Sequence, residues 1–271
     1  MKRPLAFARV PQSMMLIPLA PVLAVQAWRT VRRTPRLDPA GGDEHGFLQG
    51  ANPGAGPAFR VVVIGESTAV GVGASRHAEA LPGFLAEALR ERLRRSVAWS
   101  VSGENGATAR RITGGLVPPA NGSAPDLVVV TVGINDLIRR RPLRRWAADM
   151  AELVGVLRGR YARATVLVAG MPPVHRFPAI PQPLRYVLGA RARTMDRIMC
   201  EAAREGGAVH APMDEAMARD RGLFASDGFH PSPAGYRAWA RDLAHAAARS
   251  RPPGAAGPEP AAGRTETTGP R

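Results

Sequence analysis

Short runs of apolar residues alternate along this chain with longer segments in which apolar residues recur every three or four positions. Runs of the first kind predict strands, and segments of the second kind predict amphipathic helices. The run at 61–64 consists of valine and isoleucine, which is typical of a strand buried on both faces. Predicted strands lie at 61–64, 97–101, 126–132, 164–169 and 208–211. Predicted helices lie at 78–95, 109–116, 143–160, 184–205 and 233–249.

Strands separated by helices of this length need crossover connections, which favour a parallel sheet. We therefore predict an α/β fold, a three-layer α/β/α sandwich with a five-stranded parallel sheet, in one domain at 59–249. The segment 37–58 is rich in Gly, Pro and Asp with little periodicity, and it is predicted to be a linker. Residues 250–271 consist largely of Pro, Gly, Ala and Thr, which predicts a disordered tail.

The first 36 residues carry two conflicting signals. The mostly apolar run from Met14 to Trp28 is short for a membrane span but suits the apolar region of a signal peptide. Arginines at 29, 32, 33 and 36 follow at once, which is unusual after a cleaved signal and favours a cytoplasmic flank if the run stays in a membrane. We predict a signal or N-terminal membrane-anchor segment at 1–36, and so a secreted or membrane-attached protein of the cell envelope. A cytoplasmic protein with an apolar start is the alternative.

Composition narrows the classes of function. The chain has 271 residues, enough for a large core, and its single cysteine excludes an intrachain disulfide. Cys200 has apolar neighbours on a predicted helix and is expected to be buried. The formal net charge of +15 would favour nucleic acid or an anionic surface, but Lys2 is the only lysine, so 36 of the 37 basic residues are arginine. This looks like a coding bias, and with only 5% aromatic residues we predict no nucleic-acid partner.

Polar residues follow the predicted strands at their carboxyl ends, where open α/β sheets bind ligands. Ser67 follows the first strand, the stretch 102–108 follows the second, and Gly-Ile-Asn-Asp at 133–136 follows the third. Asp-Gly-Phe-His at 227–230 precedes the last helix. Each stretch alone is also typical of turns and helix caps. Together they supply the serine, the histidine with its aspartate and the N–H donors that acyl transfer needs.

These four stretches resemble the motifs of the SGNH hydrolases, the esterase and lipase family also called GDSL. Gly-Glu-Ser-Thr at 65–68 resembles Gly-Asp-Ser-Leu, and Asn-Gly-Ala-Thr at 105–108 resembles the second motif. The stretches at 133–136 and 227–230 match the third and fourth motifs, and the resemblance covers about 61–243. It implies a flavodoxin-like sheet, in agreement with the strand and helix pattern.

The resemblance also implies a role for each matched residue. Ser67 would be the nucleophile, His230 the base and Asp227 the acid that orients it. The oxyanion hole would be formed by the backbone N–H groups of Ser67 and Gly106 and by the side chain of Asn135. Two positions depart from the family motif, because Glu66 replaces aspartate and Thr68 replaces leucine. These changes bear on the geometry of the loop and on any inference about substrate.

The resemblance implies a serine esterase or lipase that acts on small-molecule or lipid esters without a cofactor, and the chemistry of the residues supports it. A serine hydroxyl is a weak nucleophile, so a base must take its proton, and histidine can do so near neutral pH. No pair of histidines has convincing metal-ligand spacing, so we predict no metal. An acyltransferase would use the same first half-reaction. A noncatalytic module for anionic surfaces is a third hypothesis, supported by the arginines at 139–145.

The proline-rich segment 171–184 follows the fourth predicted strand and should reach the same edge of the sheet. Its five prolines prevent a regular helix, and its apolar side chains include Phe177 and Ile180. We predict that Phe177 and Ile180 line the acyl side of the pocket. The alternative is that these side chains only seal the loop onto the sheet.

Overall fold

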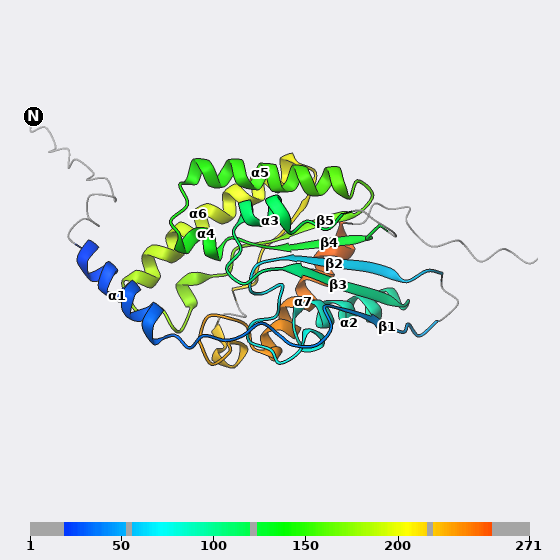
Figure 1. The fold of residues 1–271 in the computed structure, drawn as a ribbon, viewed down its shortest axis with the longest axis horizontal. Coiled ribbons are helices and arrows are strands. Elements are labelled where there is room, and N and C mark those ends of the chain that lie inside the picture. The colour runs from blue at the N-terminus through cyan, green and yellow to red at the C-terminus, as the bar shows by residue number, and fades with distance from the viewer. Residues whose placement is uncertain (1–18, 53–55, 120–123, 216–218, 251–271) are drawn as a thin grey trace, which may run out of the picture.

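The computed structural model describes residues 19–52, 56–119, 124–215 and 219–250. Within them a six-stranded sheet lies between two layers of helices (Figure 1). The strands follow the spatial order β1-β3-β2-β4-β5-β6. Their bounds are β1 His45–Leu48, β2 Phe59–Gly65, β3 Val97–Gly103, β4 Leu127–Thr131, β5 Thr165–Ala169 and β6 Val209–Ala211.

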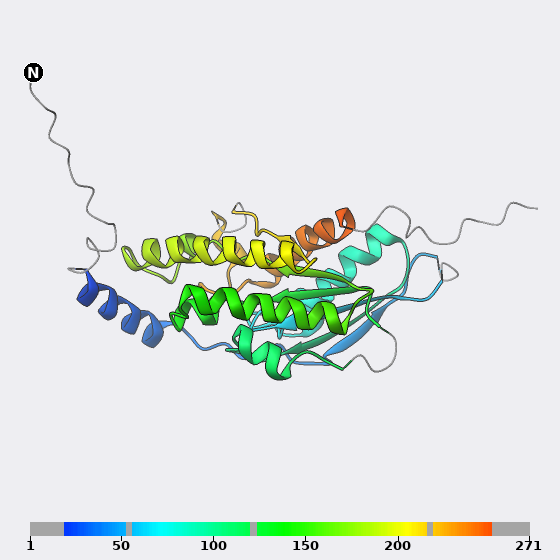
Figure 2. The same cartoon turned by 90° about the horizontal axis from the view of Figure 1, so that it is seen from above.

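Helices cover both faces of this sheet. The bounds are α1 Ala20–Arg33, α2 Leu81–Leu93, α3 Ala109–Gly115, α4 Ile134–Ile138, α5 Leu143–Arg160, α6 Leu184–Glu205 and α7 Pro233–Arg249. Short 3-10 turns lie at η2 His77–Glu79, η3 Val174–Arg176 and η5 Arg221–Leu223. Helices α3, α5 and α6 pack on one face, and α2 and α7 pack together on the other (Figure 1). Figure 2 shows α5 in green and α6 in yellow lying side by side over the sheet.

The predicted α/β sandwich is confirmed, with one strand more than predicted. The five predicted strands pair in parallel, whereas β1 pairs antiparallel with β3, with His45 opposite Ser100. The prediction of a linker throughout 37–58 is therefore wrong for 45–48. Four residues with a half-exposed pattern give no periodic signal. They form a strand only because the edge of β3 offers unpaired backbone groups.

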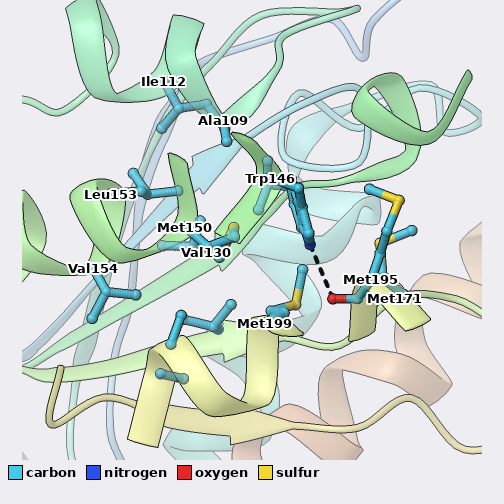
Figure 3. Close-up of a cluster of buried hydrophobic side chains, with 14 of the residues drawn as sticks. Ala109, Ile112, Val130, Trp146, Met150, Leu153, Val154, Met171, Met195 and Met199 are labelled. Atoms are coloured by element: carbon cyan, nitrogen blue, oxygen red, sulfur yellow. Dashed lines mark hydrogen bonds between the residues drawn. The ribbon is translucent and has the colours of Figure 1, made fainter. Parts of the chain in front are cut away.

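Two hydrophobic clusters hold the layers together, one on each face of the sheet. Figure 3 shows part of the cluster beneath α5 and α6, with Trp146 at its centre. Trp146 is fully buried, and its indole N–H donates to the carbonyl oxygen of Met195 at 3.0 Å. This bond removes the penalty of a buried unpaired donor, and it ties α5 to α6.

Helix α1 lies within the predicted signal or anchor segment 1–36. The Gln26 side chain donates to the carbonyl oxygen of Gln182 at 2.6 Å and accepts from the N–H of Leu184 at 3.1 Å. Residues 14–18 of the apolar run lie outside the described residues, as does the predicted tail from 251 onward. Among the residues that the structure does describe, no helix combines the length and the apolar character that crossing a membrane requires.

The burial predicted for Cys200 is wrong. Cys200 lies on α6 and is exposed, whereas its neighbour Met199 is fully buried. Consecutive residues of a helix point about 100° apart, so apolar neighbours in the sequence do not place a residue on the buried face.

Candidate active site

The candidate site is assembled where three neighbouring parallel strands end. Strand β2 leads into Ser67, β3 leads into the loop of Gly106, and β4 leads into Asn135 at the start of α4. The turn after β2 depends on a close approach between the backbones of β2 and β4. A Cβ atom on Gly65 would lie 2.2 Å from the carbonyl oxygen of Thr131, so β2 and β4 can end side by side here only without a side chain.

Ser67, His230 and Asp227 form a hydrogen-bonded chain. His230 Nε2 lies 2.9 Å from Ser67 Oγ, and His230 Nδ1 lies 2.5 Å from Asp227 Oδ2. The other carboxylate oxygen, Asp227 Oδ1, accepts from the N–H groups of Phe229 at 2.9 Å and His230 at 3.0 Å. The carboxylate therefore fixes both the ring of the histidine and the turn that carries it.

The Asp227 carboxylate is buried within this turn. Burial tends to raise its pKa, but hydrogen bonds from the His230 ring and from two backbone N–H groups outweigh that effect and lower the pKa below its usual value. Asp227 is therefore ionised near neutral pH and holds a proton on Nδ1 of His230. In that tautomer Nε2 is the nitrogen that can accept the proton of Ser67.

The histidine turn reaches the serine because the loop after β2 leaves room for it. Gly73 has φ +100°, and a Cβ atom there would lie 2.5 Å from the carbonyl oxygen of Pro231. The hydroxyl of Tyr236 on α7 donates to the carbonyl oxygen of Val72 at 2.7 Å. The first turn of α7 is thus anchored to the loop that carries Ser67.

Three N–H donors near the serine each have a hydrogen that forms no hydrogen bond within the described part of the chain. Within the described part of the chain, the backbone N–H groups of Ser67 and Gly106 have no hydrogen-bond partner. The side-chain amide of Asn135 uses one hydrogen, which it donates to Glu66 Oε2 at 2.7 Å. The loop of Gly106 is held in place by Arg139, whose guanidinium donates to the Gly106 carbonyl oxygen at 3.1 Å.

Glu66 supports the strand end that carries Asn135. Besides the side-chain amide, its carboxylate accepts from the N–H groups of Ile134 and Asn135, both at 3.3 Å. Burial raises the pKa of Glu66 to about 7, although these hydrogen bonds oppose the rise. The residue that breaks the family motif is therefore a buried group that orients Asn135.

Asp136 connects the loop after β4 to the loop after β3. Its carboxylate accepts from the N–H of Ala109, the first residue of α3, at 3.0 Å. Burial raises the pKa of Asp136, and this hydrogen bond opposes the rise. The side chain holds the start of α3, and thus the end of the Gly106 loop, beside α4.

A cavity of about 180 Å³ opens onto Ser67 and His230 and is lined mostly by apolar side chains. Phe177 is part of its wall and packs edge to face against Phe224 and Phe229, with ring centroids 5.7 Å apart in both pairs. The structure thus places Phe177 at the cavity. Ile180 is buried in the core and does not belong to the cavity lining, as the sealing alternative expected.

Several residues of the site were not identified from the sequence. Glu66 was noted only as a departure from the motif. Leu223, Phe224 and Phe229 line the cavity from the segment before the histidine, which has no helical or strand periodicity. Among the residues described, no three His, Cys, Asp or Glu side chains are grouped in a way that would hold a metal ion.

Comparison with known protein families gives a match over more than half of the chain. The sequence profile of the GDSL-like lipase/acylhydrolase family matches residues 63–238. The GDSL-like esterase Rv1075c of Mycobacterium tuberculosis is 32% identical over 196 residues, which cover 70% of this chain and 61% of that relative. The match therefore spans less than two thirds of the relative's length.

Solved structures show the same fold at low identity. The crystal structure of TesA is 18% identical with a TM-score of 0.57, and the match covers 71% of this chain and 99% of TesA. Phospholipase A1 from Streptomyces albidoflavus NA297 is 17% identical with a TM-score of 0.56, and the match covers 70% of this chain and 100% of the phospholipase. At these identities the neighbours show a shared fold.

Proposed function

Because this chain belongs to the GDSL-like lipase/acylhydrolase family, we propose that it is a serine esterase or lipase that hydrolyses carboxylic esters through an acyl-enzyme on Ser67. The observation that carries the proposal is the hydrogen-bonded chain from Asp227 through His230 to Ser67, which opens into an apolar cavity. Such a chain activates a hydroxyl for attack on a carbonyl carbon.

In the first half-reaction, Ser67 Oγ attacks the ester carbonyl while His230 Nε2 takes its proton. The imidazolium that forms is stabilised by the ionised Asp227. The negative charge on the former carbonyl oxygen meets the backbone N–H groups of Ser67 and Gly106 and the second hydrogen of the Asn135 side-chain amide. His230 then returns the proton to the leaving alcohol, and water repeats the sequence to release the acid. Loss of one such donor typically lowers turnover by about 100- to 1,000-fold.

The cavity supports esters with an apolar acyl group as substrates. Phe177, Phe224 and Phe229 form an aromatic wall beside the histidine turn. Each buried methylene of an acyl chain contributes about 0.8 kcal/mol, or roughly fourfold in binding. Specificity constants should therefore rise along a series from acetyl to octanoyl esters until the cavity is filled.

Hydrolysis of p-nitrophenyl esters by the purified chain tests the proposal. Ser67→Ala and His230→Ala should abolish turnover, whereas Ser75→Ala and His45→Ala, which change exposed residues of the same types, should not. Equal activity in all four variants would refute the proposal. Adding alcohol acceptors and analysing the products would show whether transfer to an alcohol replaces hydrolysis.

We also infer that α1 attaches the protein to anionic membrane surfaces. Val22, Val25, Trp28 and Val31 are exposed on α1, and the exposed Arg29, Arg32 and Arg33 flank them. The guanidinium of Arg32 lies 4.5 Å from the centre of the Trp28 ring. An exposed apolar stripe bordered by arginines suits a helix that lies in the headgroup region of an anionic bilayer.

The arginines that flank this stripe lie close to the candidate site. Arg29 and Arg33 line a groove whose other wall includes Pro178 and Asp227. Contact of α1 with a bilayer would therefore bring the cavity near lipid esters.

Vesicle co-sedimentation of the full chain tests the attachment. Replacing Arg29, Arg32 and Arg33 by Gln should weaken binding to anionic phospholipid vesicles by about 100-fold, at about fivefold per arginine. The same change at Arg160, Arg204 and Arg241, which are exposed on other helices, should have little effect. Any of three results would overturn the inferred attachment. Both triple variants would lose binding equally, the chain would bind neutral vesicles as well as anionic ones, or it would self-associate in place of binding vesicles.

A further inference from the structure

Two residues of the cavity lining, which we call its floor, carry buried polar atoms that the proposed mechanism does not use. Thr131 is 2% exposed and Trp239 is 4% exposed, and both residues line the cavity. Among the described residues, neither Thr131 Oγ1 nor Trp239 Nε1 has a hydrogen-bond partner. Leaving a buried donor unpaired costs about 1–3 kcal/mol, so two such atoms in one cavity call for a physical reason.

The fold directs both side chains toward the same space. Leu127 and Val129 of β4 pack in the cluster on the α7 side of the sheet, and Thr131 continues their alternation onto that face. Ala169 of β5 lies on the same face, and Trp239 projects from α7 toward it. Thr131, Ala169 and Trp239 thus enclose the part of the cavity between the strand ends and α7.

Other tryptophans of the protein do not share this condition. The indole N–H of Trp146, which is fully buried, donates to the carbonyl oxygen of Met195 at 3.0 Å. At Trp146, where the surroundings are only core, the buried indole therefore has a partner. Trp239 differs in that its neighbourhood includes the cavity that opens onto Ser67.

We propose that Thr131 and Trp239 form a subsite for a neutral oxygen carried by the substrate. The indole N–H donates to that oxygen, and the threonine hydroxyl donates to a carbonyl or ether oxygen or accepts from a hydroxyl group. The apolar lining around them disfavours a charged group. The preferred substrates are then esters with an oxygen-bearing chain in place of a plain hydrocarbon, an assignment that rests on the proposed esterase function.

Binding can be measured without turnover. In the Ser67→Ala variant with ¹⁵N-labelled indoles, the chain gives signals from its four tryptophans, and Trp239→Phe identifies the one from Trp239. The titrants are methyl hexanoate and three isosteres in which one chain methylene is replaced by an ether oxygen. At least one isostere should move the Trp239 indole proton downfield, whereas methyl hexanoate should not.

Two conservative variants complete the test. Thr131→Val and Trp239→Phe should each weaken binding of the responsive isostere by about tenfold, at constant affinity for methyl hexanoate. Thr165→Val and Trp99→Phe, away from the cavity lining, are the matched controls. Thermal unfolding of each variant excludes a general loss of structure.

Two results would overturn the subsite: the same indole shift with all four esters, as expected if a permanently held water occupies the floor, or no binding of any ester. Hydrolysis assays on the wild type separate this outcome from failure of the proposed function. Discrimination by oxygen without hydrolysis supports the subsite and refutes the esterase. Hydrolysis of esters without discrimination by oxygen supports the esterase and refutes the subsite.

Discussion

Glu66 allows a prediction about stability that does not depend on turnover. Burial raises its pKa from 4.5 to about 7, and the hydrogen bonds from Asn135 and Ile134 oppose the rise only in part. Because the pKa is higher in the folded protein than in the unfolded chain, folding is favoured by protonation of this group. The resulting stabilisation is fully present below about pH 4.5 and is lost as the pH rises through about 7.

The size of the effect follows from the two pKa values. They differ by about 2.5, and each pKa unit corresponds to about 1.4 kcal/mol, so the free energy of unfolding should change by about 3 kcal/mol. Glu66→Gln cannot titrate at this position. From about pH 4.5 to about pH 8, the wild type should therefore lose about 3 kcal/mol relative to the variant, because the other titrating groups are common to both.

Urea unfolding of both proteins across this pH range measures the difference. Glu91→Gln, a change at an exposed glutamate on α2, should give a difference that is independent of pH. Two results would refute the reasoning. The difference in free energy of unfolding between the wild type and Glu66→Gln would not depend on pH, or the wild type would become more stable relative to the variant as the pH rises.

The same variant also tests whether Glu66 positions Asn135. A glutamine at 66 presents an amide N–H toward backbone N–H groups that now meet a carboxylate, so the Asn135 amide should lose its fixed orientation. We expect kcat to fall and KM to change little, because the oxyanion forms only in the reaction. Glu66→Asp retains a carboxylate and should recover part of kcat.

Three further predictions concern the surrounding structure. Gly73→Ala should lower both Tm and kcat, because its Cβ would lie 2.5 Å from the carbonyl oxygen of Pro231; unchanged kcat would contradict this. Asp227→Asn should lower kcat by about 10,000-fold with the fold intact, since an amide no longer selects the reactive tautomer of His230. Its stability relative to the wild type should rise as the pH falls through the lowered pKa of Asp227, which acid unfolding can check. Trp146→Phe should cost about 1–3 kcal/mol in urea unfolding by loss of the bond to Met195, and turnover per folded molecule should not change.

Much of the fold could be predicted from periodicity alone. Helices α5, α6 and α7 have the predicted bounds, because each has a wide buried face that imposes a period of 3.6 residues over four or more turns. Strand β1 could not be predicted in this way. It is short and half-exposed, and its pairing with β3 is a contact across about fifty residues of chain.

In the candidate site, too, some contacts could be predicted from the sequence and others could not. Ser67 and His230 are 163 residues apart, yet their contact could be expected from the motifs, because parallel topology brings strand ends to one edge. Their catalytic roles stay predictions until the variants are assayed. The partnership of Glu66 with Asn135 had no such signal, because a carboxylate one residue before the serine can point to solvent or to the core.

Substrate specificity could not be predicted from the sequence, and the reason is physical. Ser67, Gly106 and Asn135 each follow the end of a strand by a few residues, so the sheet fixes their position. The aromatic wall of the cavity comes instead from Phe177, Phe224 and Phe229, whose positions depend on their contacts with one another. Even the floor depends on an alternation that is invisible in β4, since all five of its residues are buried on one face or the other. Only the packing of α7 shows that Thr131 faces a cavity where Val129 faces a core. Changes at Thr131 and Trp239 should therefore alter which esters react, whereas changes at Ser67 and His230 should decide whether any ester reacts.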